Sequence, residues 1–165
     1  MKQTATLDAS FWVDAQRVGL LPYVHHRYQL CYASDVAEEL SPTLPSGRDF
    51  WRQARAGLLT AVAVDQDQAS DLGPGARAAI NLALAHPDWI LLLDDQKPYR
   101  EAVARGLRVL CSPVLITALF SEGTLDAAQA LLALARLAAL QTVSPHLVKA
   151  AIAHVGRSLR QPKGG

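Results

Sequence analysis

The sequence has few of the residues that mark several common classes of protein. Its 165 residues include two cysteines, Cys31 and Cys111, which lie far apart in apolar segments and form no CxxC motif. This argues against a disulfide framework and against structural zinc, so we expect two reduced thiols in the core. Charged residues make up 19% of the chain and the net charge is +1. A global basic field is therefore excluded, and a nucleic-acid partner would have to be recognised through a local patch.

Long apolar runs and targeting signals are also missing. The first twelve residues are too short and too polar for a signal peptide, and the apolar stretch 125–140 is interrupted by Asp126, Gln129 and Arg136. We therefore expect a cytoplasmic protein with no membrane segment. The hydrophobic content of 50% is ample for one core. It predicts a single domain over residues 1–156, followed by a basic, disordered tail over residues 157–165.

The sequence contains no complete phosphate-binding loop. Gly73, Pro74 and Gly75 suggest one, but neither the Walker spacing nor the dinucleotide GxGxxG pattern is present, and Pro74 has no backbone N–H to donate. The simpler prediction is a helix that begins here with proline in its first turn.

The strongest positive feature is the stretch WILLLDDQKPYR at residues 89–100. Its apolar residues lie between turn signals, which predicts a strand buried on both faces. In open α/β sheets, ligands bind beyond the carboxyl ends of such strands, which is where Asp94 and Asp95 lie. Either acid alone can instead be the N-cap of the helix that begins near Lys97, and this alternative stays open.

Strand-like and helical segments alternate along the rest of the chain. This alternation predicts βαβ units and a mostly parallel sheet that is covered by helices on both faces. The expected strands are residues 4–7, 27–33, 58–64, 89–93 and 107–111.

The acids follow different strands of this predicted sheet. Asp8 ends the first strand as Asp94 and Asp95 end the fourth, and Glu39 lies in the helix after the second strand. Parallel strands bring these carboxylates to one edge, where their repulsion favours a hard cation such as Mg²⁺ or Mn²⁺. Such a site suits phosphodiester hydrolysis. The other interpretation is that Asp8 or Ser10 merely caps the first helix.

The order of the motifs carries a resemblance that covers most of the chain. The segments TLDAS, DVAEEL, LGPGARAAINLA and ILLLDDQKPYREAVARGLRVLCS together resemble the PIN-domain nucleases. The similarity is to a compact prokaryotic branch akin to the toxins of VapBC-type toxin–antitoxin pairs. It implies a PIN-like, Rossmann-like α/β/α sandwich, an acidic Mg²⁺ or Mn²⁺ site and endoribonuclease activity. It also implies RNA as substrate, a small antitoxin as partner and a homodimer.

The resemblance assigns roles to individual positions. Asp8, Glu39 and Asp95 match the metal-binding acids, with Asp94 as the close neighbour of Asp95. The residues expected to contact substrate are Ser10, Lys97, Arg100 and Ser112.

The chain departs from the family pattern at one acid. Relatives place a glutamate just after the position of Gly75 and often a second acid two residues on, where this chain has Ala76 and Ala78. The alternative is therefore a catalytically degenerate PIN-fold protein that binds RNA or a protein partner without cleavage. Asn81, which follows on the same predicted helix, could offer a neutral oxygen to the ion, but the simpler expectation is a surface residue.

Overall fold

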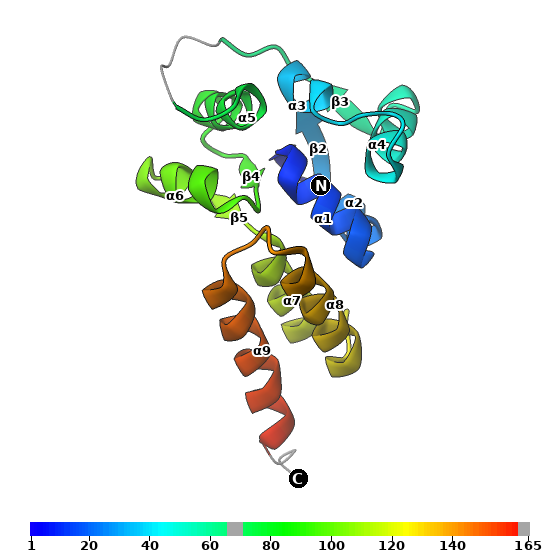
Figure 1. The fold of residues 1–165 in the computed structure, drawn as a ribbon, viewed down its shortest axis with the longest axis vertical. Helices are drawn as coiled ribbons and strands as arrows, with labels where there is room; N and C mark the ends of the chain where they lie inside the picture. Colours follow the sequence, from blue (N-terminus) through cyan, green and yellow to red (C-terminus); the bar gives the residue numbers. More distant parts are fainter. Residues whose placement is uncertain (66–70, 162–165) are drawn as a thin grey trace.

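The chain forms a three-layer α/β/α sandwich around a parallel sheet, in a computed structural model that describes residues 1–65 and 71–161 (Figure 1). The described strands form one five-stranded sheet in the order β3-β2-β1-β4-β5, and every pairing is parallel. Most of the polar loop predicted around residues 65–71 lies outside the described residues. The strands are β1 (Gln3–Leu7), β2 (Tyr28–Tyr32), β3 (Leu59–Ala61), β4 (Ile90–Leu92) and β5 (Val109–Leu110).

Helices cover both faces of the sheet. Figure 1 shows α5 and α6 on one side, α1, α2 and α4 on the other, and a bundle of α7, α8 and α9 that extends away from the sheet. The helices are α1 (Ala9–Val18), α2 (Leu21–Arg27), α3 (Ser34–Glu38), α4 (Pro45–Arg55), α5 (Pro74–Ala85), α6 (Gln96–Ala104), α7 (Ser112–Ser121), α8 (Ala127–Leu140) and α9 (Pro145–Arg160).

The central strands are buried as the apolar runs predicted. Strand β1 lies between β2 and β4, with Ala5 opposite Ile90 and Leu7 opposite Leu92. Leu7 and Leu92 are fully buried, and so is Leu93, which follows β4. This register places the carboxyl ends of β1 and β4 side by side. Asp8 and Asp94 therefore emerge at one edge of the sheet, as the predicted topology requires.

Three local features differ from the sequence predictions. Helix α2 was not expected. It forms because Gly19 ends α1 in the left-handed region at φ 79° and Pro22 stands in the first turn of the next helix. The sequence favours Ser34 as the N-cap of the helix after the second strand, but Ser34 is the first residue of α3 and Ala33 is the N-cap. Helix α9 continues to Arg160 instead of ending at Gly156, and its last turn carries Arg157 and Arg160, which suit a helix C-terminus.

The expectation for the cysteines is confirmed. Cys31 and Cys111 are both buried and form no disulfide. Within residues 1–65 and 71–161, no helix combines the length and the apolar character needed to cross a bilayer.

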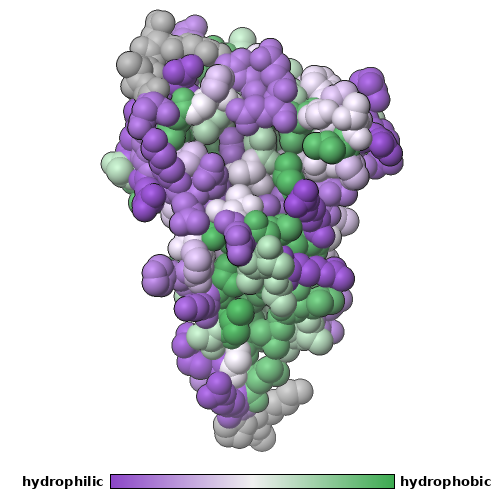
Figure 2. All heavy atoms as spheres, viewed as in Figure 1, coloured by the Kyte–Doolittle hydropathy of each residue, from purple (hydrophilic) through white to green (hydrophobic). Residues whose placement is uncertain are grey.

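The helical bundle presents apolar side chains to solvent. Figure 2 shows hydrophobic residues gathered on the half of the molecule formed by α7, α8 and α9. Leu132 on α8 is 53% exposed, and Ile152 and Leu159 on α9 are 40% and 61% exposed. These side chains contribute little to the core of the single chain.

A matched pair of leucine truncations tests which elements carry the core. We expect Leu92→Ala to lower the free energy of unfolding by about 2–5 kcal/mol, because it leaves a cavity in the hydrophobic core beside the sheet. Leu132→Ala removes the same atoms from an exposed site, and its expected change is within about 0.5 kcal/mol. Urea unfolding of both variants measures the difference. Equal losses would contradict the assigned burial.

Candidate acidic site at the carboxyl edge of the sheet

The hydroxyl group of Ser10 joins the ends of strands β1 and β4. It donates to Asp8 Oδ2 at 2.5 Å and accepts from the backbone amides of Asp94 and Asp95, both at 3.1 Å. The Ser10 amide also donates to Asp8 Oδ2, at 3.0 Å. A serine hydroxyl offers one donor and two acceptor positions, and all are used here. Ser10 therefore holds Asp8 and the Asp94–Asp95 peptide at a fixed separation.

Asp8 is a buried acid with one oxygen left over. Its side chain caps α1 through Oδ2, which confirms the capping interpretation for that oxygen. Oδ1 is buried and has no hydrogen-bond partner in the described part of the chain. Burial raises the pKa of Asp8, the hydrogen bonds from Ser10 oppose this, and the charge of Asp95 adds to the rise. An unpaired buried carboxylate oxygen is costly, so its retention points to a role outside folding.

Glu39 lies just after α3 and reaches over the start of α5. Its Oε1 accepts from the amide of Gly75 at 2.9 Å. A Cβ atom at Gly75 would lie 2.3 Å from that oxygen, so any other residue here would push the carboxylate out of this position. Partial burial raises the pKa of Glu39, the Gly75 amide opposes this, and the nearby charges of Asp8, Asp35 and Asp95 raise it further. Glu39 thus belongs to the same electrostatic cluster as Asp8.

Asp94 is a buried acid, 2% exposed, whose two oxygens both bond to Ser112. Its Oδ1 accepts from the Ser112 amide at 2.7 Å, and its Oδ2 accepts from the Ser112 hydroxyl at 2.6 Å. These bonds tie the end of β4 to the start of α7. Ser112 is fully buried, so in this structure it positions Asp94 and has no surface open to a substrate.

Asp14 is a buried acid of this region that the sequence analysis missed. It lies on α1, is 2% exposed, and its Oδ1 accepts from Thr142 Oγ1 at 3.2 Å. Burial, followed by the nearby carboxyl group of Asp14, raises the pKa of Asp94 well above its usual range. The available signal was a lone acid six residues after Asp8, on a helix whose other inward residues are apolar.

The charged residues after Asp94 lie at the surface. Asp95 is exposed and is the N-cap of α6 by backbone position, but its side chain makes no capping hydrogen bond. Lys97 forms an ion pair with Asp71 at 2.7 Å. Arg100 is exposed and borders a cavity that also reaches Asp94. Asp95 is therefore the member of the pair with a carboxylate open to solvent.

The departure from the family pattern lies on α5. Ala78 is fully buried, Ala76 is half-buried, and the expectation that Asn81 lies at the surface is wrong. Asn81 is 7% exposed because α5 packs onto β1 and β4, and its Nδ2 has no hydrogen-bond partner among the described residues. A fourth acidic ligand is absent at Ala76 and Ala78.

The carboxylate oxygens are the right donor atoms for a hard cation, but the acids are not arranged as a complete binding site in the described residues. Asp8 has an unpartnered oxygen, and the acids raise one another's pKa, which is the repulsion that a divalent ion relieves. In residues 1–65 and 71–161, however, no three His, Cys, Asp or Glu side chains are arranged to hold one ion together. The donor atoms fit the ion, and the complete ligand set is not preassembled.

Comparison with known proteins identifies the family. A family described as a PIN domain matches residues 5–157, which is nearly the whole chain. The chain therefore belongs to the PIN-domain family, a nuclease superfamily, which confirms the resemblance of its motifs to PIN domains. A search of curated proteins found no match.

Two glycines at the start of α5 form a matched test of the Glu39 contact. We expect Gly75→Ala to displace the Glu39 carboxylate, because the new Cβ atom would lie 2.3 Å from its Oε1. That oxygen is at the end of a flexible, exposed side chain, so the free energy of unfolding should fall by only about 1 kcal/mol or less. Loss of the hydrogen bond from the Gly75 amide should raise the pKa of Glu39 further, which an NMR titration measures. Gly73→Ala meets nothing within 4 Å and should leave the pKa of Glu39 unchanged. An unchanged pKa in Gly75→Ala would contradict the contact.

Asp8→Asn tests the burial of the acid through pH. Because the pKa of Asp8 is raised in the folded state, its ionisation destabilises the fold as pH rises through that pKa. The penalty is absent below the unfolded value of 3.8. We therefore expect Asp8→Asn to stabilise the protein at pH 7 and to lose that advantage in acid. Urea unfolding at both pH values measures it; a destabilised variant at pH 7 would contradict the assignment.

Proposed function

We propose that this PIN-domain protein is a Mg²⁺- or Mn²⁺-dependent endoribonuclease that acts in the cytoplasm. The observation that carries the proposal is the unpartnered, buried Oδ1 of Asp8, which lies in one electrostatic cluster with Glu39 and Asp95. Folding alone gives no reason to keep that oxygen ionisable and unbonded.

The chain's own residues divide into ligands and supports. Asp8, Glu39 and Asp95 would hold the ion, which when bound lowers the pKa of its water and neutralises charge on the phosphate. Ser10 orients Asp8 and the peptide of Asp95. Asp94 serves the site indirectly, because both its oxygens are engaged by Ser112.

Two cations beside the acids would position the phosphate backbone. Arg100 is exposed. Lys97 is paired with Asp71, whose side chain is 79% exposed, and such surface pairs contribute little, so a phosphate group can compete for the lysine. Both residues lie on the first turns of α6, next to Asp95. Substrate phosphate would thus lie between this helix and the acidic cluster.

A second function has its own supporting observations. Ala76 and Ala78 replace family acids, and the described acids do not form a complete three-ligand site. These features favour a protein that binds RNA or a protein partner without cutting.

Whichever of the two functions holds, we propose that a small antitoxin is a partner of this protein. We also propose a homodimer, which the exposed apolar residues of α8 and α9 support.

Metal binding and cleavage distinguish the two functions. We expect Mn²⁺ to bind wild-type protein in calorimetry and to support cleavage of single-stranded RNA. Asp8→Asn removes a proposed ligand, so it should weaken Mn²⁺ binding and reduce cleavage by roughly 100-fold or more, beyond the loss typical of residues that only support a ligand. The control is Asp126→Asn, the same chemical change at an exposed N-cap of α8, where asparagine caps equally well.

The outcomes separate cleanly. RNA binding without metal-dependent cleavage in the wild type favours the non-cleaving function. Cleavage that survives in Asp8→Asn, or falls equally in Asp126→Asn, contradicts the proposed site.

A further inference from the structure

A second feature of the acidic edge is a cavity of about 520 Å³ that begins at Asp94. One wall comes from α6 through Gln96, Tyr99 and Arg100, and the other comes from the start of α9 through Ser144 and His146. The two walls are far apart in sequence and meet only in the fold. Because Asp95 adjoins Asp94, the cavity opens beside the proposed ligand cluster.

The lining has the chemistry of a nucleotide-binding site. Tyr99 is half-buried and His146 is exposed, so each offers part of an aromatic ring. Gln96 carries an amide that can donate and accept, as base edges require, and Arg100 supplies a guanidinium group. Among residues 1–65 and 71–161, no acidic side chain forms an ion pair with Arg100. Its charge remains available to a phosphate group.

Two helices also begin at this cavity. The nine-residue α6 starts at Gln96 and the sixteen-residue α9 starts at Pro145, so both positive helix ends lie at its rim. Each helix has a proline in its first turn, Pro98 or Pro145, which removes one donor, and the amides that remain free favour an anion. This field offsets the negative charge of the neighbouring carboxylates, which would otherwise repel a nucleic-acid strand.

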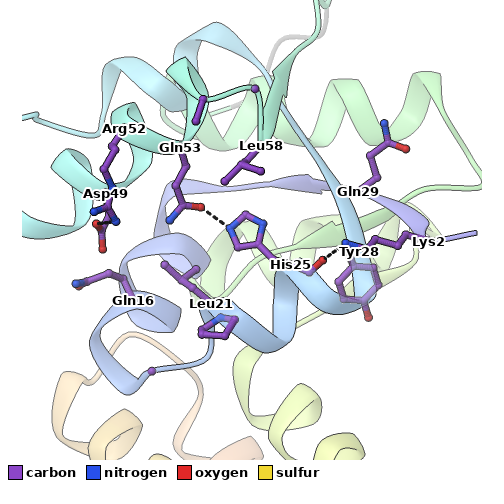
Figure 3. Close-up of a pocket in the computed structure, with 14 residues that line it drawn as sticks. Lys2, Gln16, Leu21, His25, Tyr28, Gln29, Asp49, Arg52, Gln53 and Leu58 are labelled. Atoms are coloured by element: carbon purple, nitrogen blue, oxygen red, sulfur yellow. Dashed lines mark hydrogen bonds and ion pairs between the residues drawn. The ribbon is translucent and has the colours of Figure 1, made fainter.

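A second, larger cavity does not share this chemistry. It measures about 990 Å³ and lies at the amino ends of the strands (Figure 3). Its lining includes an acid, Asp49, which lies 2.6 Å from Arg52 and offsets the charge of that arginine, and Lys2 Nζ donates to the His25 carbonyl at 2.6 Å. Figure 3 shows the His25 ring directed at Gln53, its hydrogen-bond partner. This cavity borders none of the carboxylates of the acidic cluster.

We propose that the cavity formed by α6 and the start of α9 holds one unpaired nucleotide of the substrate strand, next to the phosphate that is cut. Tyr99 stacks on the base, Gln96 contacts its edge, and Arg100 binds a flanking phosphate. The inference rests on the proposed function for its substrate, and it adds a selection for single strands, because a paired base cannot enter the cavity.

Binding measured in a chelator tests the cavity without depending on cleavage. The probe is a fluorescent single-stranded oligoribonucleotide, followed by anisotropy in EDTA with the full chain. We expect Tyr99→Ala to weaken binding roughly tenfold, and Tyr99→Phe, which keeps the ring, to bind as wild type. Arg100→Ala should weaken binding several-fold and reduce the dependence of log Kd on log salt by about 0.7. Arg52→Ala makes the same charge change at the opposite cavity and should have no effect.

Binding of other oligonucleotides in the same assay identifies the ligand. The same oligonucleotide annealed to its complement should bind more weakly, as should an oligonucleotide that lacks bases. A deoxyribonucleotide version distinguishes RNA from DNA as the source of the nucleotide: preference for RNA supports the proposal, and preference for DNA overturns the assignment of RNA. Circular dichroism confirms that each variant is folded.

The cavity proposal and the nuclease proposal would be contradicted by different results. Wild-type protein that binds no single strand overturns the cavity assignment, as does unchanged binding in both Tyr99→Ala and Arg100→Ala. Weakening by Arg52→Ala instead would move the site to the other cavity. Binding that follows the predicted pattern without any metal-dependent cleavage leaves the cavity standing and rejects the nuclease proposal.

Discussion

The contact on which the acidic edge depends is the hydroxyl group of Ser10. It donates to Asp8 and accepts from two successive amides, so one small side chain joins the end of β1 to the end of β4. Strand register alone would bring Asp8 and Asp94 near each other, but it would not set the orientation of either carboxylate. A second bridge, from Asp94 to Ser112, extends the connection to α7. Two serine hydroxyl groups thus connect β1 to β4 and β4 to α7 along this edge.

These bridges explain why neighbouring acids behave differently. Asp94 is enclosed, with both oxygens bonded to Ser112 and its pKa raised well above the usual range by burial and by the nearby Asp14. Asp95 is one residue further on and lies in solvent. Asp8 lies between these extremes, buried but with one oxygen unpaired. Burial of like charges at one edge costs stability, and proteins keep such arrangements where function requires them.

The site also depends on elements remote from the acids in sequence. The Glu39 carboxylate occupies the space beside Gly75 and accepts from its amide, so α5 helps to place this acid. Thr142, in the connection between α8 and α9, donates a hydrogen bond to Asp14 on α1. The helical bundle is therefore connected to the acidic edge, and the start of α9 forms one wall of the adjoining cavity.

Much of the architecture followed from local patterns in the sequence. The apolar run before Asp94, the alternation of strands and helices, and the motif order were sufficient to predict a parallel α/β/α fold and the family, because these depend on periodicity and chain order. They also indicated which acids follow strand ends. Only the tertiary structure decided three other features, which are the packing of α5 that buries Asn81, the approach of Asp14 to Asp94, and the meeting of α6 with α9. Each depends on contacts between residues distant in the chain, and a single sequence carries no local signal for such contacts.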